Sequence, residues 1–222
     1  MAKSANSAVK PGSKAVTARP TRESLIARAA ARRRNQNFLI MGGAALFVLL
    51  IGFIVYLNIR GAQPVAGEET LNSQGNSHID SGATSPLAYN STPPTSGPHY
   101  GNLVAWKIYG PDQPQRYENL VHNMEDAGVL IYYQCPDNCP DLLKQLSDIA
   151  DSYIKAGKHV AVIPNNPSWT VNGSQPLHKD MGAHIALTAW TKILKMDQVD
   201  AAKIRKFIDQ YEGIDHHVGG TG

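Results

Sequence analysis

The chain has 222 residues and a formal net charge of +3 at pH 7. This length predicts one folded domain with additional segments. Residues 1–37 contain nine Lys and Arg and one acidic residue, a net charge of +8, so residues 38–222 carry −5. A basic segment can indicate nucleic-acid binding. The apolar segment that follows explains the basic residues better, and we predict no nucleic-acid partner.

The apolar segment Phe38–Leu57 contains 20 residues and no charge. As a helix it is about 30 Å long, which matches the hydrocarbon thickness of a bilayer. Because Arg32–Arg34 precede it, the positive-inside rule predicts a cytoplasmic N-terminus and places residues 61–222 outside the cell membrane. The alternative is a cleaved signal peptide, whose apolar region is normally about 7–15 residues long. We predict a single-pass protein anchored in the lipid bilayer.

The outer part of the chain predicts an α+β domain. Apolar, β-rich runs and helical 3–4 spacings alternate in the order strand, helix, strand, strand, helix. This order predicts a small mixed β-sheet packed with two helices, with a parallel strand–helix–strand crossover. The predicted elements are a strand over 128–133, a helix over 141–154, strands over 159–164 and 184–190, and a helix over 199–211.

Upstream of these elements, Leu103–Tyr109 favours a short strand or a covering segment, and Leu120–Val121 favours a strand. The predicted organisation is a basic cytoplasmic tail (1–37), a transmembrane helix (38–58), a flexible linker (59–88), an extracytoplasmic α+β domain (89–213) and a disordered tail (214–222).

Both cysteines of the chain, Cys135 and Cys139, lie between the strand over 128–133 and the helix that Pro140 begins. Four residues of spacing allow a disulfide, because Cα atoms one helical turn apart are about 6 Å from each other. The helix N-terminus also favours a thiolate. Three interpretations are open: a structural disulfide, a ligand pair for a soft metal such as copper, and a redox pair.

Candidate metal ligands lie in two phrases before the strand over 128–133. One is a stiff, Pro-rich segment that ends in a His, and the other is His-Asn-Met-Glu-Asp at residues 122–126. Imidazole, thioether and carboxylate together suit a transition metal; copper tolerates the thioether, and zinc prefers the carboxylates. We predict a metal site with copper favoured over zinc, and a structural role for His122 is the alternative. The candidate ligands are His78, His99, His122, Met124 and Asp126.

The C-terminal pair His216 and His217 lies in a Gly-rich end and can bind metal weakly. We predict that it belongs to the disordered tail.

Four phrases point to one family: PPTSGPH at Pro93–His99, VHNMEDAGV at Val121–Val129, CPDNCP at Cys135–Pro140 and LTAW at Leu187–Trp190. In this order they resemble the bacterial and archaeal family numbered 3105 among the domains of unknown function, over about residues 78–212. The resemblance implies a domain that follows a membrane anchor and brings no established activity. The Cys phrase is also locally similar to the copper-delivery Sco proteins, which have a thioredoxin-like fold.

The chain departs from the phrase His-Asn-Leu-Glu-His-Gly that is usual in that family. Met124 replaces the Leu, Asp126 replaces the second His, and Ala127 is inserted before Gly128. If the family binds a metal through these His residues, this chain has lost one nitrogen ligand and gained an oxygen ligand.

No nucleophile elbow, phosphate-binding Gly loop or His-Glu-x-x-His motif occurs in the sequence, which favours a protein that is not an enzyme. The first hypothesis is an envelope protein that binds a transition metal. The second is a thiol–disulfide oxidoreductase that uses Cys135 and Cys139. The third is a structural or assembly subunit of a membrane protein complex.

Overall fold

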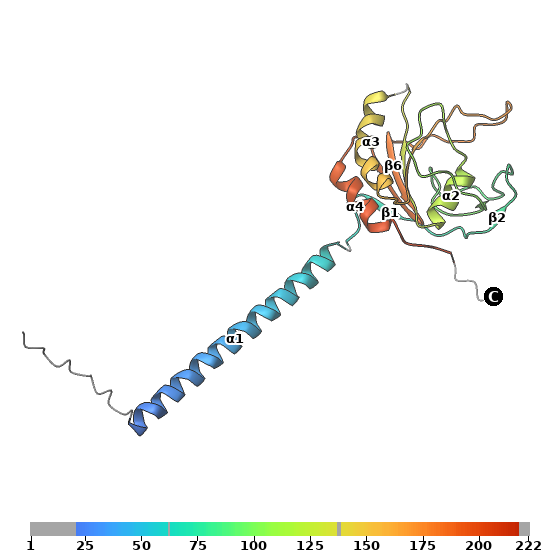
Figure 1. Ribbon diagram of the computed structural model, residues 1–222. Coiled ribbons are helices and arrows are strands. Elements are labelled where there is room, and N and C mark those ends of the chain that lie inside the picture. Colours follow the sequence, from blue (N-terminus) through green and yellow to red (C-terminus); the bar gives the residue numbers. More distant parts are fainter. Residues whose placement is uncertain (1–20, 62, 137–138, 218–222) are drawn as a thin grey trace, which may run out of the picture. The chain divides into compact units, whose positions relative to one another are not determined.

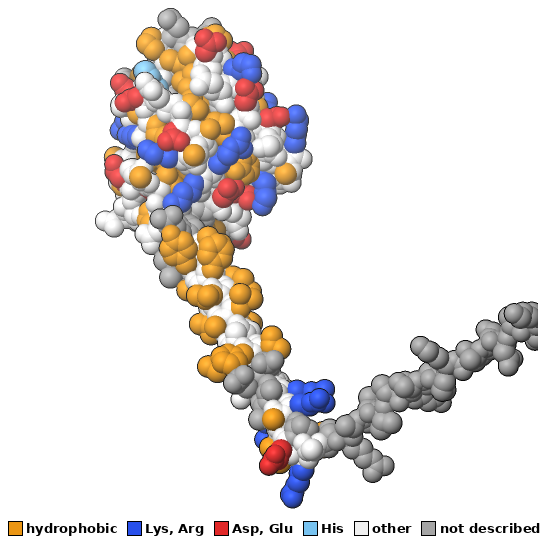
Figure 2. Space-filling view, turned by 90° about the vertical axis from the view of Figure 1, so that its left-hand side faces the viewer, with side chains coloured by type: hydrophobic (Ala, Val, Ile, Leu, Met, Phe, Trp, Pro, Cys, Tyr) orange, Lys and Arg blue, Asp and Glu red, His pale blue; other side chains and the backbone are white. Residues whose placement is uncertain are grey.

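The computed structural model describes residues 21–61, 63–136 and 139–217 and divides into two compact units, residues 1–60 and 61–222. In the first unit, helix α1 (Arg22–Gly61) joins the end of the basic segment to the apolar segment without a break. Its stretch Gln36–Leu57 is long and apolar enough to cross a membrane, and a signal sequence has the same properties. Hydrophobic side chains cover this stretch, and Lys and Arg side chains lie toward its N-terminal end (Figure 2).

The second unit contains a five-stranded mixed sheet in the order β1–β7–β6–β4–β5. Strand β4 pairs in parallel with β5 and antiparallel with β6, and β7 is antiparallel to both β6 and β1. Helix α3 (Pro140–Lys155) connects the parallel pair, as the sequence predicted. The strands are β1 (Glu68–Thr70), β4 (Val129–Tyr133), β5 (Val160–Pro164), β6 (Ile185–Ala189) and β7 (Lys192–Met196).

Helices cover both faces of this sheet. Helices α3 and α4 (Ala201–Tyr211) lie on one side, and α2 (Tyr117–Glu125) lies on the other (Figure 1). Alternate residues of β4 face the two layers: Ile131 packs in the cluster that includes α3 and α4, and Tyr132 packs in the cluster that includes α2. All five residues of β4 are buried because both faces are covered. The predicted α+β class, with a mixed sheet packed with helices, is confirmed.

Helix α2 corrects the prediction of a strand at Leu120–Val121. Apolar residues recur every three or four positions along it, which is the helical period. The polar residues between them, including His122 and Glu125, are also buried, so they interrupt the apolar pattern. The apolar set is Tyr117, Leu120, Val121 and Met124. For Leu103–Tyr109 the sequence allowed a short strand or a covering segment, and the structure has the covering segment. Within it, Ile108 makes an isolated bridge to Val162.

The described part of the predicted flexible linker, residues 59–88, is ordered by pairing with distant strands. Strand β1 pairs with β7, and β2 (His78–Ile79) pairs in parallel with β3 (His99–Tyr100). Backbone hydrogen bonds drive this pairing, so polar, exposed side chains such as Glu69 and Thr70 gave no sequence signal for it. Two short strands thus lie within the segment that was predicted as a linker, and β2 brings His78 next to His99.

Gly128 connects α2 to β4 at a point where no side chain fits. Its N–H donates to the Asn123 carbonyl at 2.9 Å. A Cβ atom on this residue would lie 2.4 Å from the same carbonyl oxygen and 2.3 Å from Cη2 of Trp106. This close approach fixes the end of α2 against the sheet, and with it the position of Glu125.

The substitution Gly128→Ala is expected to lower the free energy of unfolding by about 1–3 kcal/mol, because a backbone carbonyl must move to admit the Cβ. Thermal unfolding measures the change, at roughly 2–4 °C per kcal/mol for a domain of this size. The control is Gly101→Ala, whose Cβ would come no closer than 3.8 Å to the ring of His78; it should change stability by less than about 0.5 kcal/mol. Equal melting temperatures for the two variants would contradict the packing role of Gly128.

Candidate metal centre

Three imidazoles and one carboxylate meet where β2, β3 and α2 come together. The ligand atoms of His78, His99, His122 and Glu125 all lie within 4.8 Å of one another, so this group could hold a metal ion. Strands β2 and β3 place His78 and His99 opposite each other in register. Helix α2 places His122 and Glu125 three residues apart, on the same face of the helix.

The Glu125 carboxylate is the centre of this group. Its Oε2 lies 2.9 Å from Nε2 of His99, 3.6 Å from Nδ1 of His122 and 3.7 Å from Nε2 of His78. Its Oε1 accepts a hydrogen bond from Nδ2 of Asn76 at 2.8 Å. Only 1% of this side chain is exposed, and a buried carboxylate is costly unless a positive group or strong donors compensate it.

The hydrogen bond of His99 Nδ1 determines whether Nε2, the ring nitrogen next to Glu125, carries a hydrogen in the neutral ring. Nδ1 of His99 lies 2.8 Å from the carbonyl oxygen of Gly97, which can only accept, so Nδ1 bears the hydrogen. In neutral His99 the Nε2 lone pair therefore points at a carboxylate oxygen 2.9 Å away. Two acceptors at this distance need a proton or a cation between them. Two ligands about 2.1 Å from one metal ion are about 3.0 Å apart at 90° and about 3.4 Å apart at 110°. The pair at 2.9 Å is slightly closer than this, so binding an ion would move the two atoms apart by a few tenths of an ångström.

The imidazole of His122 also has the properties of a potential metal ligand. Burial lowers the pKa of its imidazole, an effect that Asp126 partly opposes, so the ring is neutral near pH 7. Its Nδ1 is buried and makes no hydrogen bond within the described structure. A neutral imidazole with an unused, buried nitrogen is the form that binds a metal ion.

Residues 214–217 of the predicted disordered tail are described and lie against the end of α2; residues 218–222 lie outside the described range. Nε2 of His217 is 3.6 Å from Oε2 of Glu125 and 3.3 Å from Oδ1 of Asp126. Asp126 lies at the rim of the group, where its Oδ2 is 3.8 Å from Nε2 of His122. The tail therefore brings a further imidazole to the site.

Met124 lies away from these residues, in the hydrophobic cluster with Leu120 and Tyr132, where it is fully buried. Two helical positions separate it from His122, which corresponds to about 200° around the helix axis. Glu125, by contrast, was considered with the other residues of the sequence phrase, but Asp126 was predicted as the carboxylate ligand in its place. Its i, i+3 relation to His122 is the signal that identifies it, once α2 is recognised as a helix.

Residues 80–219 match the family described as Protein of unknown function (DUF3105). The chain belongs to this family. The matched range includes His99, His122, Glu125 and His217, while His78 comes just before it. No curated protein and no solved structure matches the chain. Membership confirms the family resemblance, and the likeness of the Cys phrase to Sco proteins stays a prediction.

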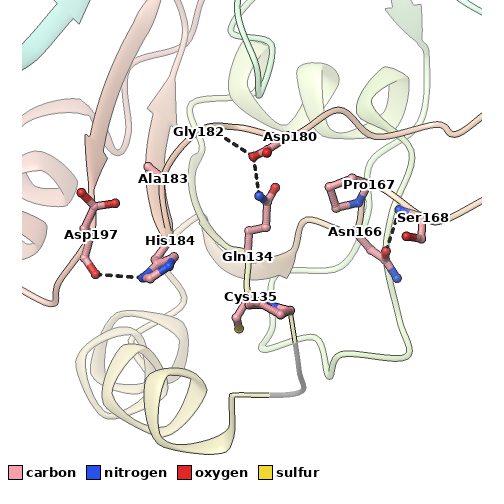
Figure 3. A pocket seen from close by; sticks show the side chains of 11 residues that line it. Gln134, Cys135, Asn166, Pro167, Ser168, Asp180, Gly182, Ala183, His184 and Asp197 are labelled. Atoms are coloured by element: carbon pink, nitrogen blue, oxygen red, sulfur yellow. Dashed lines mark hydrogen bonds between the residues drawn. The ribbon is translucent and has the colours of Figure 1, made fainter.

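The two cysteines of this DUF3105 domain form a disulfide, with Cα atoms 6.3 Å apart. In this state neither sulfur is a thiolate that could bind a soft metal. Cys135 lines a pocket of about 500 Å³ at the carboxyl end of β4, which we call the disulfide pocket (Figure 3). Asp180 fixes one wall of it by accepting hydrogen bonds from Gln134 Nε2 at 2.6 Å and from the Gly182 N–H at 2.8 Å. Of the two cysteines, Cys135 is the one that lines this pocket.

His178 is a histidine with a structural role. Its Nδ1 accepts from the Asn166 N–H at 3.0 Å, and its Nε2 donates to the Gln115 carbonyl at 2.7 Å. Its ring stacks on Tyr117 with centroids 4.5 Å apart. Burial lowers its pKa to about 4. Protonation would place a second N–H against that of Asn166, so the fold requires the neutral ring.

Acid is therefore expected to destabilise the domain through His178. Between its folded pKa of about 4 and the unfolded value of 6.5, the unfolded chain binds the extra proton. The free energy of unfolding then falls as pH falls through this window, by at most about 3 kcal/mol for this group.

Denaturant unfolding between pH 4.5 and 7.5 measures this effect. The variant His178→Asn should be less stable at pH 7 but should lose less stability on acidification. His184→Asn is the control, because His184 is exposed and should keep the wild-type slope. The same slope in His178→Asn and wild type would refute the assignment.

Proposed function

We propose that the DUF3105 domain binds one divalent transition-metal ion between His78, His99, His122 and Glu125. The main support is geometric: His99 Nε2 and Glu125 Oε2 are held 2.9 Å apart in a buried place, and the ligand atoms of two further imidazoles lie within 4.8 Å of them. A cation between them compensates the buried carboxylate and uses the Nδ1 of His122 that makes no hydrogen bond. His78, whose side chain is 54% exposed, gives the ion a path from solvent.

The ligand set favours Cu²⁺ or Zn²⁺. Three imidazoles and a carboxylate are borderline to hard ligands, and the Irving–Williams order places Cu²⁺ above Zn²⁺ and the other first-row ions. The sequence favoured copper partly for the thioether of Met124, which lies in the core. Copper thus remains the tighter ion in this proposal, but as Cu²⁺ bound by nitrogen and oxygen.

We infer that the domain works outside the cytoplasm as part of a single-pass protein, with α1 as anchor in the lipid bilayer and the N-terminus inside. The disulfide supports this location, because disulfides persist in oxidising compartments. The basic residues before the apolar stretch support the orientation. In this setting the site serves metal binding and transfer at the membrane surface.

Full-length protein purified in detergent without a His-tag and loaded with Zn²⁺ or Cu²⁺ should hold about one ion per chain by elemental analysis. His99→Ala removes a proposed ligand and Glu125→Gln removes the charge of one, so each should weaken binding by more than the roughly 10–100-fold that loss of a hydrogen-bond partner of a metal ligand costs. His184→Ala, which removes an exposed imidazole elsewhere, should bind like wild type.

The double variant Cys135→Ser/Cys139→Ser should also keep its metal, because the disulfide is not part of the site. Wild-type protein that holds no metal after reconstitution would sink the proposed function. Undiminished binding in His99→Ala would refute the location of the site.

The disulfide pocket favours a second candidate function, thiol–disulfide exchange with a protein dithiol. A substrate thiolate that enters the pocket attacks Sγ of Cys135, the disulfide breaks, and Cys139 leaves as a thiolate at the N-terminus of α3. A second substrate thiol then displaces Cys135. The substrate dithiol is oxidised to a disulfide, both cysteines are reduced, and the two substrate protons pass to the cysteine thiolates or to solvent.

Reaction with glutathione tests this second function. Acid quenching and mass spectrometry should find the mixed disulfide mainly on Cys135, because that residue lines the pocket. The metal-site variant His122→Ala should react at the wild-type rate. A disulfide in the folded protein that forms no adduct would rule out exchange. If metal is also absent, the third hypothesis, a structural or assembly subunit of a membrane complex, becomes the function to test.

A further inference from the structure

We propose that the C-terminal tail provides a fifth ligand, His217, and closes the metal site. This inference rests on the proposed metal-binding function. We call residues 213–217 the C-terminal clasp. They follow the end of α4 and run past the carboxyl end of α2, where Glu125 and Asp126 lie.

Backbone hydrogen bonds hold the clasp in place. The Gly213 N–H donates to the Ala127 carbonyl at 2.9 Å, and the His216 N–H donates to the Glu125 carbonyl at 3.0 Å. The ring of His216 stacks on Trp190, with centroids 5.9 Å apart and an interplanar angle of 21°. The clasp is therefore attached to the residue that forms the centre of the metal site.

Asp215 orients the imidazole of His217. Its Oδ1 lies 2.8 Å from Nδ1 of His217, and a carboxylate only accepts, so Nδ1 bears the hydrogen. The other nitrogen, Nε2, faces Oε2 of Glu125 at 3.6 Å and Oδ1 of Asp126 at 3.3 Å. A carboxylate behind one ring nitrogen is the usual support of a histidine whose other nitrogen binds a metal ion.

Of the five proposed ligands, His217 is one of the two whose side chains are most exposed. It lies as close to Oε2 of Glu125 as His122 does, 3.6 Å in both cases. Its side chain is 43% exposed, against 0% for His99, and it is not among the four residues whose ligand atoms lie mutually within 4.8 Å. The metal thus draws His217 inward onto a preformed group. When the clasp opens, a coordination position becomes free for a ligand from solvent or from an acceptor of the metal.

The test uses full-length protein in detergent, with Zn²⁺ affinity measured by competition with a chromophoric chelator. His217→Ala should weaken binding about 10–100-fold, and Asp215→Asn, which removes only the orienting carboxylate, about 10-fold. His184→Ala is the matched control outside the site. The visible spectrum of bound Co²⁺ gives a second measurement, because its intensity rises as the number of ligands falls toward four.

A weaker affinity and a more intense Co²⁺ spectrum in His217→Ala, with His184→Ala unchanged, would support the clasp. If wild type binds, His122→Ala does not, and His217→Ala matches wild type in both measurements, the clasp is wrong and the metal site stands. A weaker affinity with an unaltered Co²⁺ spectrum would also overturn direct ligation by His217. No binding in wild type would overturn both proposals.

Discussion

The buried carboxylate of Glu125 is the constraint on which the organisation of this site depends. A carboxylate with 1% of its side chain exposed needs positive charge or strong donors around it. Imidazole groups from four separate segments surround it: β2, β3, helix α2 itself and the C-terminal tail. The short strands β2 and β3 have almost no apolar core of their own. Their pairing places His78 and His99 beside Glu125.

The two faces of the sheet carry different features. On one face, α3 and α4 pack a conventional apolar cluster, and Cys135 and Cys139 lie at its border. On the other face, α2 packs its apolar residues inward and turns His122 and Glu125 toward β2 and β3. Because Gly128 permits a close approach between α2 and β4, the same backbone joint that completes the fold also sets the position of the carboxylate. The packed core and the candidate metal site thus share one short helix.

Polar residues explain where sequence reasoning succeeded and where it failed. The strands and helices from residue 128 onward were recognised because their apolar residues follow simple periods. The exception is β7, which was not predicted because Lys192 and Lys195 interrupt its apolar run. Helix α2 was missed because buried polar residues interrupt its apolar pattern. Strands β1 and β2 were missed because backbone pairing with residues far along the chain leaves no local trace in side-chain type.

The sequence by itself determined the apolar segment of α1, the α+β class, the family, and a His-rich candidate site. The apolar segment and the α+β class depend on local composition and on period, which a single chain displays directly. The family followed from the resemblance of four sequence phrases, and the candidate site from the residue types in two of them. Only the tertiary structure decided that Glu125 is the central carboxylate, that Met124 belongs to the core, and that His217 approaches the site. The physical reason is that a ligand set is defined by distances between side chains. Those distances follow from strand pairing and helix orientation between residues as far apart in the chain as Glu125 and His217.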